Sequence, residues 1–305
     1  MERNNYSSRV LAVIITYNGM AWIKRCLNSL ITSSLIPDIF VVDNGSNDGT
    51  QLYIQENYPQ IHFTQNKTNL GFGKANNIGL QYALDHGYDY VYLMNQDAWV
   101  QNDSIEKIIA VSKLHTEYGI LSPFQMTSDL ITIDKNFSTY VCSYQSNPNI
   151  LSDFYNNSPK MVYPVPSVMA AHWLITRDCL RKVGGFSPSF PHYGEDLNYT
   201  RRAMFHSFKI GIVPSIRTVH DRATRTTSPK PEYMSYINAI DILSNPSDKG
   251  GSIIKQSLRL LHNCYAHTSF RPILYSIRLI MSFSSIKKNK NISKLNRCAF
   301  LTPNS

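Results

Sequence analysis

The chain has 305 residues, of which 43% are hydrophobic and 17% charged, a composition typical of a globular protein with one large core or two small ones. Its five cysteines are scattered and form no CxxC pair, which argues against a disulfide framework and a structural zinc site and favours a reducing cytoplasm. Residues 201–305 carry 17 Lys and Arg against 4 Asp and Glu, which predicts either a solvated basic tail or a surface for an anionic partner: lipid, nucleic acid or a phosphorylated substrate.

The first hundred residues alternate between strand-like and helix-like segments. Val10–Thr16 is an unbroken apolar run, typical of a strand buried on both faces and too short for a signal peptide or a membrane span. Further strands are predicted at Ile39–Asp43, Ile61–Thr64 and Tyr90–Met94, and helices at Met20–Ile31 and Lys74–Leu84. This alternation predicts a doubly wound α/β sheet whose ligands bind beyond the carboxyl ends of its strands.

The second half of the chain has weaker patterns. Residues 125–165 are rich in Ser, Asn, Thr and Tyr and predict loops with an edge hairpin. After them we expect a strand at Val168–Thr176, helices at Arg177–Val183 and Glu195–Phe208, a strand at Lys209–His220, an exposed loop over residues 224–233 and basic helices to about residue 300.

Polar residues at the predicted strand ends are the first candidates for chemistry. Asp97 follows a buried strand, where a carboxylate could hold a divalent metal against a diphosphate, although a lone Asp is more often a helix or turn cap. The adjacent Glu195 and Asp196 begin an amphipathic helix, whose dipole favours an ionised carboxylate able to act as a base; acids there are also common caps. His220 ends a strand and could complete a metal site, or be structural.

The segment GFGKANN offers a glycine-relaxed backbone and a lysine, Lys74, at a helix start. Its spacing is neither that of a P-loop nor that of a dinucleotide-binding fingerprint, which argues against an NTPase and a dehydrogenase. The segment therefore predicts only a modest anion-binding site.

Seven features in order resemble the family-2 glycosyltransferases with a GT-A fold, especially their rhamnosyltransferase-like branch. They are IITYNG, VVDNGSNDGT, NLGFGKANNIG, LMNQD, GGF, GEDLNYTRR and the late His220, spread over roughly residues 9–222. The resemblance implies a GT-A type mixed sheet in a catalytic domain over residues 1–228. Residues 9–100 would be its Rossmann-like nucleotide-sugar-binding half and residues 101–228 its acceptor-binding half, with a basic helical extension over 229–305.

The resemblance also implies roles for individual residues. Asp97 matches the last Asp of the family's DxD motif and His220 a metal-ligand position of some members, so the pair would bind Mg²⁺ or Mn²⁺. Asp196 matches the general base of an inverting displacement, with Glu195 beside it. The residues implied to bind the nucleotide-sugar donor are Thr16, Tyr17, Asn18, Asp43, Asn69, Gly71, Lys74, Asn95 and Gln96.

Two departures from the family pattern keep alternatives open. Asn95 replaces the usual first acid of the DxD motif, and Asn44 stands where relatives often have a second Asp. A catalytically silent protein that binds sugar nucleotides or glycans is therefore the second hypothesis. A nucleotidylyltransferase lacks the expected glycine-rich loop after the first strand, and a nucleic-acid binder would leave the strand-end acids without a purpose.

Residues 253–298 form the basic C-terminal segment. Apolar residues alternate there with Lys255, Arg259, Arg271 and Arg278, which forbids a membrane span. The pattern predicts either helices on an anionic membrane or a subdomain packed on the core. Relatives that build surface polysaccharides often use glycan or lipid-diphosphate acceptors, which implies a cytoplasmic protein, peripheral on the inner face of the membrane.

Overall fold

The computed structural model describes residues 8–141, 147–222, 229–248, 251–267, 270–295 and 297–302. Within them, strands form one mixed sheet in the order β3-β2-β1-β4-β8-β6-β9-β5, with β7 also paired to β9. The strands are β1 (Val10–Thr16), β2 (Asp38–Asp43), β3 (His62–Gln65), β4 (Tyr90–Asn95), β5 (Ala98–Val100), β6 (Tyr118–Met126), β7 (Tyr163–Pro164), β8 (His172–Thr176) and β9 (Lys209–His220).

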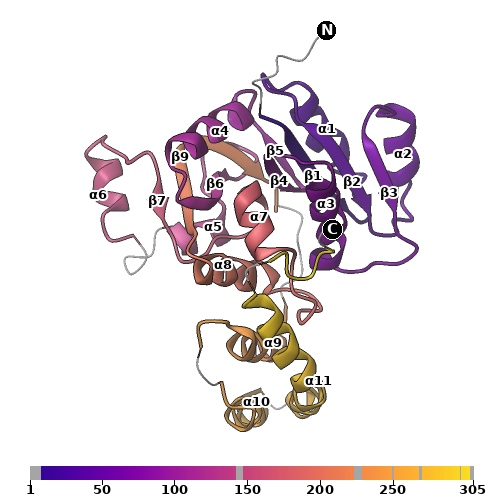
Figure 1. Ribbon diagram of the computed structural model, residues 1–305, viewed down its shortest axis with the longest axis vertical. Helices are drawn as coiled ribbons and strands as arrows, with labels where there is room; N and C mark the ends of the chain where they lie inside the picture. Colours follow the sequence, from indigo (N-terminus) through magenta and orange to yellow (C-terminus); the bar gives the residue numbers. More distant parts are fainter. Residues whose placement is uncertain are drawn as a thin grey trace.

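Helices cover both faces of the sheet and extend beyond it (Figure 1). They are α1 (Ile23–Ile31), α2 (Thr50–Asn57), α3 (Phe72–Asp85), α4 (Ser104–Leu114), α5 (Lys135–Val141), α6 (Ile150–Tyr155), α7 (Arg177–Val183), α8 (Glu195–Phe205), α9 (Pro231–Ser244), α10 (Ile253–His267) and α11 (Arg271–Ser293). One core joins the sheet to α3, α7 and α8, and a second joins it to α1, α2 and α4. The mixed α/β sheet and the C-terminal helices confirm the predicted fold class.

The amino-terminal half of the sheet is parallel. β1 lies between β2 and β4, with Thr16 opposite Asp43 and Ile15 opposite Asn95. Because parallel strands end at the same edge, the polar residues that follow β1, β2 and β4 gather there.

Antiparallel pairing brings the late part of the chain to the same region. β8 runs antiparallel to β4, and β9 runs antiparallel to β5, which begins just after Asp97. In that pairing Ala98 lies opposite His220, and the Asp221 N–H donates to the Asp97 carbonyl at 2.8 Å. The short strand β5 therefore places the end of β9 beside Asp97.

Several expected boundaries were wrong. Helix α1 begins at Ile23 instead of Met20, because the Gly19 carbonyl accepts hydrogen bonds from the Trp22 and Ile23 N–H groups in a turn. Residues 168–171 precede β8, and α8 ends at Phe205.

Residues 125–165 also differ from the expected loops and edge hairpin. Strand β6 extends to Met126, the helices α5 and α6 follow, and a single antiparallel bridge joins Met126 to Ile133. Helices of six or seven residues leave too little periodicity for sequence analysis to detect. Residues 142–146, and residues 223–228 of the expected loop over 224–233, lie outside the described residues.

The C-terminal helices α9, α10 and α11 lie at one end of the molecule, with α8 between them and the sheet (Figure 1). They share a separate apolar cluster that includes Tyr236, Ile240, Leu260 and Leu279. Asp241 of α9 pairs with Arg201 of α8, so the helical unit is attached to the helix that begins with Glu195 and Asp196. Among the described residues, no helix is both long enough and apolar enough to span a bilayer.

Candidate active site

A cavity of about 590 Å³ opens where β1, β2 and β4 end. Six of the predicted donor-site and metal-site residues line it: Tyr17, Asn69, Gly71, Asn95, Gln96 and Asp97. Asn44, Pro191 and His192 complete much of its wall. The cavity is open on one side and carries amide, carbonyl and carboxylate groups, which suits a polar ligand with a phosphate or sugar part.

Two predicted donor-binding residues, Thr16 and Asp43, lie behind this wall. Thr16 is buried, and its hydroxyl donates to Gln96 Oε1 at 2.7 Å; the Tyr17 N–H donates to the same oxygen at 2.8 Å. The carboxylate of Asp43 is also buried and accepts hydrogen bonds from the Gly45 and Ser46 N–H groups and from the Ser46 hydroxyl. These groups shape the strand-end turns that form the cavity.

Asn18 and Lys74 stand apart from the cavity lining. Asn18 has a left-handed backbone (φ 49°), and its Oδ1 accepts a hydrogen bond from the Asn47 N–H at 3.0 Å. Lys74 lies in the first turn of α3 and lines a smaller neighbouring cavity with Leu70 and Pro191. Asn18 therefore supports the turn that contains Asn47, and Lys74 lies on the outer side of the cavity.

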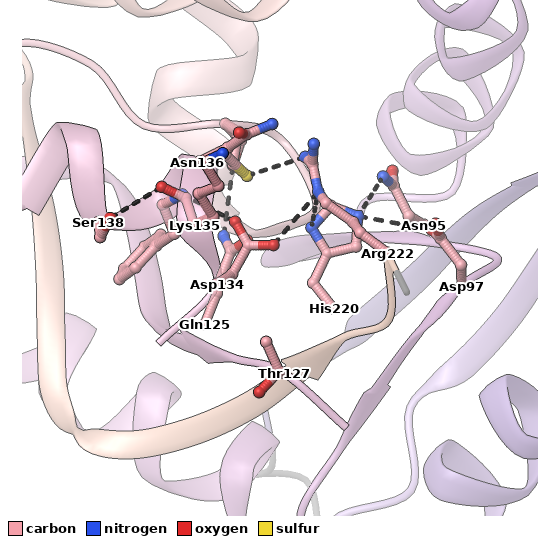
Figure 2. Close-up of polar contacts among 12 residues, drawn as sticks. Asn95, Asp97, Gln125, Thr127, Asp134, Lys135, Asn136, Ser138, His220 and Arg222 are labelled. Carbon is pink, nitrogen blue, oxygen red and sulfur yellow. Dashed lines mark hydrogen bonds and ion pairs between the residues drawn. The ribbon is translucent and has the colours of Figure 1, made fainter. Parts of the chain in front are cut away.

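Asp97 and His220 meet at the end of this cavity. His220 Nε2 lies 3.5 Å from Asp97 Oδ1 and 3.4 Å from Asn95 Nδ2, and both Asp97 and His220 are buried (Figure 2). Asp97 and His220 are far apart in the sequence, and the β5–β9 pairing brings them together.

Arg222 and its partner Asp134 are residues of this site that the sequence analysis missed. The Arg222 Nε–H donates to His220 Nδ1 at 3.3 Å, and the same Nε lies 3.3 Å from Asp134 Oδ2, so the guanidinium stands between them (Figure 2). Asp134 is buried and also accepts the Phe137 N–H at the start of α5. The available signal was spacing: residues two apart in an extended chain point to the same side, as His220 and Arg222 do.

The Arg222 contact determines which nitrogen of a neutral His220 carries the proton. Because Nδ1 accepts from Arg222, the proton of a neutral ring in this arrangement is on Nε2 and faces Asp97; the Asn95 Nδ2 group is itself a donor and then makes no hydrogen bond to Nε2. A metal would need the lone pair of Nε2, so binding through His220 requires Arg222 to release Nδ1.

Asp97 and His220 offer a carboxylate and an imidazole to a divalent ion. The Asp97 carboxylate suits Mg²⁺ or Mn²⁺ and lines the cavity, and the His220 imidazole lies within reach. Among the described residues, no three His, Cys, Asp or Glu side chains gather closely enough to hold an ion by themselves. The pair therefore fits an ion whose remaining ligands come from phosphate oxygens and water.

The acids at the start of α8 have unusual environments. Gly194 precedes the helix with φ 83°, a conformation that favours glycine. Burial raises the pKa of Asp196, against the opposing effects of the Leu197 and Ala170 N–H groups and the Arg222 charge. The Leu197 N–H donates to Asp196 Oδ1 at 2.8 Å.

Glu195 is the more deeply buried of the two acids. Burial raises its pKa to about 8, and the charge of Asp196 contributes in the same direction. Within the described part of the chain, Glu195 Oε1 has no hydrogen-bond partner. Neither Glu195 nor Asp196 is among the residues that line the cavity, but the Arg222 charge acts on Asp196 while Arg222 contacts His220, so the candidate base lies within electrostatic reach of the candidate metal pair.

Comparison with known proteins gives a family match over more than half of the chain. The model of the family described as "Glycosyl transferase family 2" matches residues 11–183. The N-acetylglucosaminyl-diphospho-decaprenol L-rhamnosyltransferase of Mycobacterium tuberculosis is 26% identical over 241 residues, covering 70% of this chain and 76% of that protein. The low-salt glycan biosynthesis hexosyltransferase Agl10 of Haloferax volcanii is 21% identical over 230 residues, covering 74% and 71%.

Solved structures with the same fold are more distant in sequence. TarS 1–349 of S. aureus, in complex with UDP-GlcNAc, matches with a TM-score of 0.59 at 14% identity, covering 94% of this chain and 84% of that one; the match covers 44% of a longer TarS chain. The mannosyltransferase PcManGT of Pyrobaculum calidifontis, with GDP-Man and Mn²⁺, has a TM-score of 0.55 at 15% identity, covering 94% and 85%.

Proposed function

Because the chain belongs to glycosyl transferase family 2 and is a glycosyltransferase, we propose that it transfers a sugar, with inversion, from a nucleotide-diphosphate donor to a hydroxyl of a glycan or lipid-linked acceptor. The observation that carries the proposal is the cavity bounded by Asn95, Gln96 and Asp97, with His220 beside Asp97 and with the Arg222 charge acting on Asp196. We also propose that the protein belongs to the rhamnosyltransferase-like branch of the family and acts in surface polysaccharide synthesis.

In the proposed reaction the acceptor oxygen forms a bond to the donor sugar C1 as the bond from C1 to the diphosphate oxygen breaks. The hydroxyl proton moves to Asp196, and the nucleoside diphosphate leaves with the bonding electron pair. The raised pKa of Asp196 increases its proton affinity, which suits a base that must still be ionised near neutral pH.

The leaving diphosphate needs compensating positive charge. Mg²⁺ or Mn²⁺ would supply it when bound, and Asp97 and His220 are the residues proposed to hold the ion. Tyr17, Asn69, Gly71, Asn95 and Gln96 would orient the donor from the cavity wall, supported by Thr16, Asn18 and Asp43 behind it. Lys74, on the outer side, would be reached only by an extended part of the ligand.

Donor hydrolysis tests the proposal. A thermal-shift panel of UDP-, dTDP- and GDP-sugars with Mn²⁺ first identifies the donor that stabilises the wild type. Slow hydrolysis of that donor should fall by about 10²-fold or more in Asp97→Ala and in Asp196→Asn. Asp129→Asn, an exposed acid in the Thr127–Thr132 turn, is the control and should leave hydrolysis unchanged.

The alternative, a catalytically silent binding protein, predicts a different result. The donor would then stabilise the fold, but neither the wild type nor Asp196→Asn would hydrolyse it. That outcome would reject the enzymatic proposal. We further propose that the protein is cytoplasmic and works at the inner face of the membrane, where lipid-diphosphate acceptors are found.

A further inference from the structure

Helix α10 turns its apolar side chains outward. Ile254, Leu258 and Leu261 are exposed at spacings of four and three residues, and Ile254 is 69% exposed. The opposite side buries Leu260 together with the polar side chains of Gln256 and Ser257. A helix that served only to pack on the protein would show the reverse distribution.

Helix α11 also exposes a stripe of apolar side chains. Its exposed apolar residues recur at helical spacing, starting at Phe270 just before the helix. Phe270 and Met281 are the most exposed of them, with 84% and 80% of their surface exposed. The stripe consists of Phe270, Ile273, Leu274, Ile277, Ile280 and Met281. The buried side of α11 combines the apolar Leu279 and Ile286 with the small or polar residues Ser276, Asn289 and Ser293.

The apolar stripes are bordered by cations. Lys255 and Arg259 follow Ile254 and Leu258 by one residue each, and both line a groove of about 870 Å³ between α9 and α10. Arg278 is exposed beside Ile277. Residues 249–305 contain ten Lys or Arg and no Asp or Glu. An exposed apolar stripe with this border suits an apolar partner with an anionic surface.

From these observations we propose that the outward faces of α10 and α11 dock on an anionic lipid bilayer, with the apolar stripes in the interfacial layer and the cations on the headgroups. The helices lie side by side at the end of the molecule farthest from the sheet, where a flat surface can reach them (Figure 1). A second copy of the chain fits less well, because two such faces would oppose like charges. This inference rests on the membrane location in the proposed function and identifies the surface responsible for it.

Vesicle sedimentation with the full chain tests the docking. Vesicles of phosphatidylglycerol with phosphatidylcholine are compared with pure phosphatidylcholine, using the wild type and the double variant Leu258→Glu/Ile277→Glu. We expect binding to the anionic vesicles, weakened by salt, and at least about tenfold weaker in the double variant. Lys255→Gln/Arg259→Gln should lose about 30-fold in affinity for anionic vesicles, because each of the two cations near an anionic surface contributes about 1 kcal/mol.

Leu114→Glu is the control, because Leu114 is an apolar residue of α4 that is more exposed than Leu258 or Ile277 and lies away from the C-terminal helices. It should bind vesicles like the wild type. The inference is overturned if the wild type ignores anionic vesicles, if Leu258→Glu/Ile277→Glu binds as tightly, or if that variant instead converts a dimer to a monomer. Donor hydrolysis is measured alongside: its absence with vesicle binding intact rejects the enzymatic proposal and leaves the docking surface standing.

Discussion

At the scale of single residues, Glu195 has the most unusual environment in the candidate site. It is buried, its Oε1 has no hydrogen-bond partner in the described structure, and its pKa is raised from 4.5 to about 8. The folded protein therefore holds a proton that the unfolded chain releases between these two values. Stability contributed by this group falls as pH rises from about 4.5 to about 8 and is level above that.

Glu195→Gln should remove this pH dependence, because glutamine stays neutral at the same size. We expect the variant to match the wild type near pH 4.5 and to exceed its free energy of unfolding by about 2–4 kcal/mol at pH 9. Chemical denaturation across this pH range measures the difference. Glu56→Gln, on the exposed surface of α2, should show no such trend. Parallel curves for Glu195→Gln and the wild type would mean that Glu195 is not held as a neutral acid.

At the scale of elements, the loop between β3 and α3 depends on the amide of Asn44. Asn44 Oδ1 accepts from Asn66 Nδ2 and from the Leu70 N–H, each at 3.1 Å, while its Nδ2 donates to Asn69 Oδ1 at 3.0 Å. A carboxylate at this buried position could not make the donation. The replacement of an expected acid by Asn44 therefore has a structural reason in this chain.

Asn44→Asp should disturb this loop, because it sets two acceptor oxygens against each other and adds a buried charge. We expect a loss of about 1–3 kcal/mol in stability and at least about tenfold weaker donor binding, since Asn69 and Gly71 line the cavity. Calorimetry with the donor found by thermal shift measures the binding. Asn57→Asp, on the exposed surface of α2, is the control. Unchanged donor affinity in Asn44→Asp would show that the loop does not shape the donor site.

The elements also show what could be predicted from sequence. Long apolar runs such as Val10–Thr16 predict strands, and polar residues after them predict a site at the strand ends, so Asp97 was recognisable. The arrangement of the later strands depends on long-range pairing that no local pattern encodes. Arg222 and Asp134 join the site only through that pairing, and both were missed.

At the scale of the whole molecule, residues 297–302 pack against α3, α7 and Gly185, which belong to the part of the chain that forms the sheet and its covering helices, here called the catalytic body. The Cys298 N–H donates to the Arg181 carbonyl at 2.7 Å, the Gly185 N–H to the Ala299 carbonyl at 2.8 Å, and the Thr302 N–H to Gln81 Oε1 at 2.8 Å. The expected extension over 229–305 therefore includes a segment packed on α7 and α3. A deletion from residue 253 would remove this segment together with α10 and α11, which is why point substitutions are the better test of lipid docking.

Truncation after residue 296 isolates the contribution of this returning segment. It removes the three contacts above and the ring of Phe300, which lies 4.9 Å from the guanidinium carbon of Arg202, a buried residue of α8. At about 1 kcal/mol for each lost hydrogen bond, we expect the free energy of unfolding to fall by about 3 kcal/mol and Tm by roughly 5–10 °C, measured by calorimetry.

A glycine at the contact provides the control for that truncation. A Cβ on Gly184 would overlap the Ala299 carbonyl oxygen, so Gly184→Ala should displace the segment from the full chain. In the truncated chain only the backbone strain at φ 79° remains, so the same substitution should cost less. This non-additivity separates loss of the contact from general damage to the fold. Equal costs of Gly184→Ala in both chains, or an unchanged Tm after truncation, would show that the returning segment does not stabilise the catalytic body.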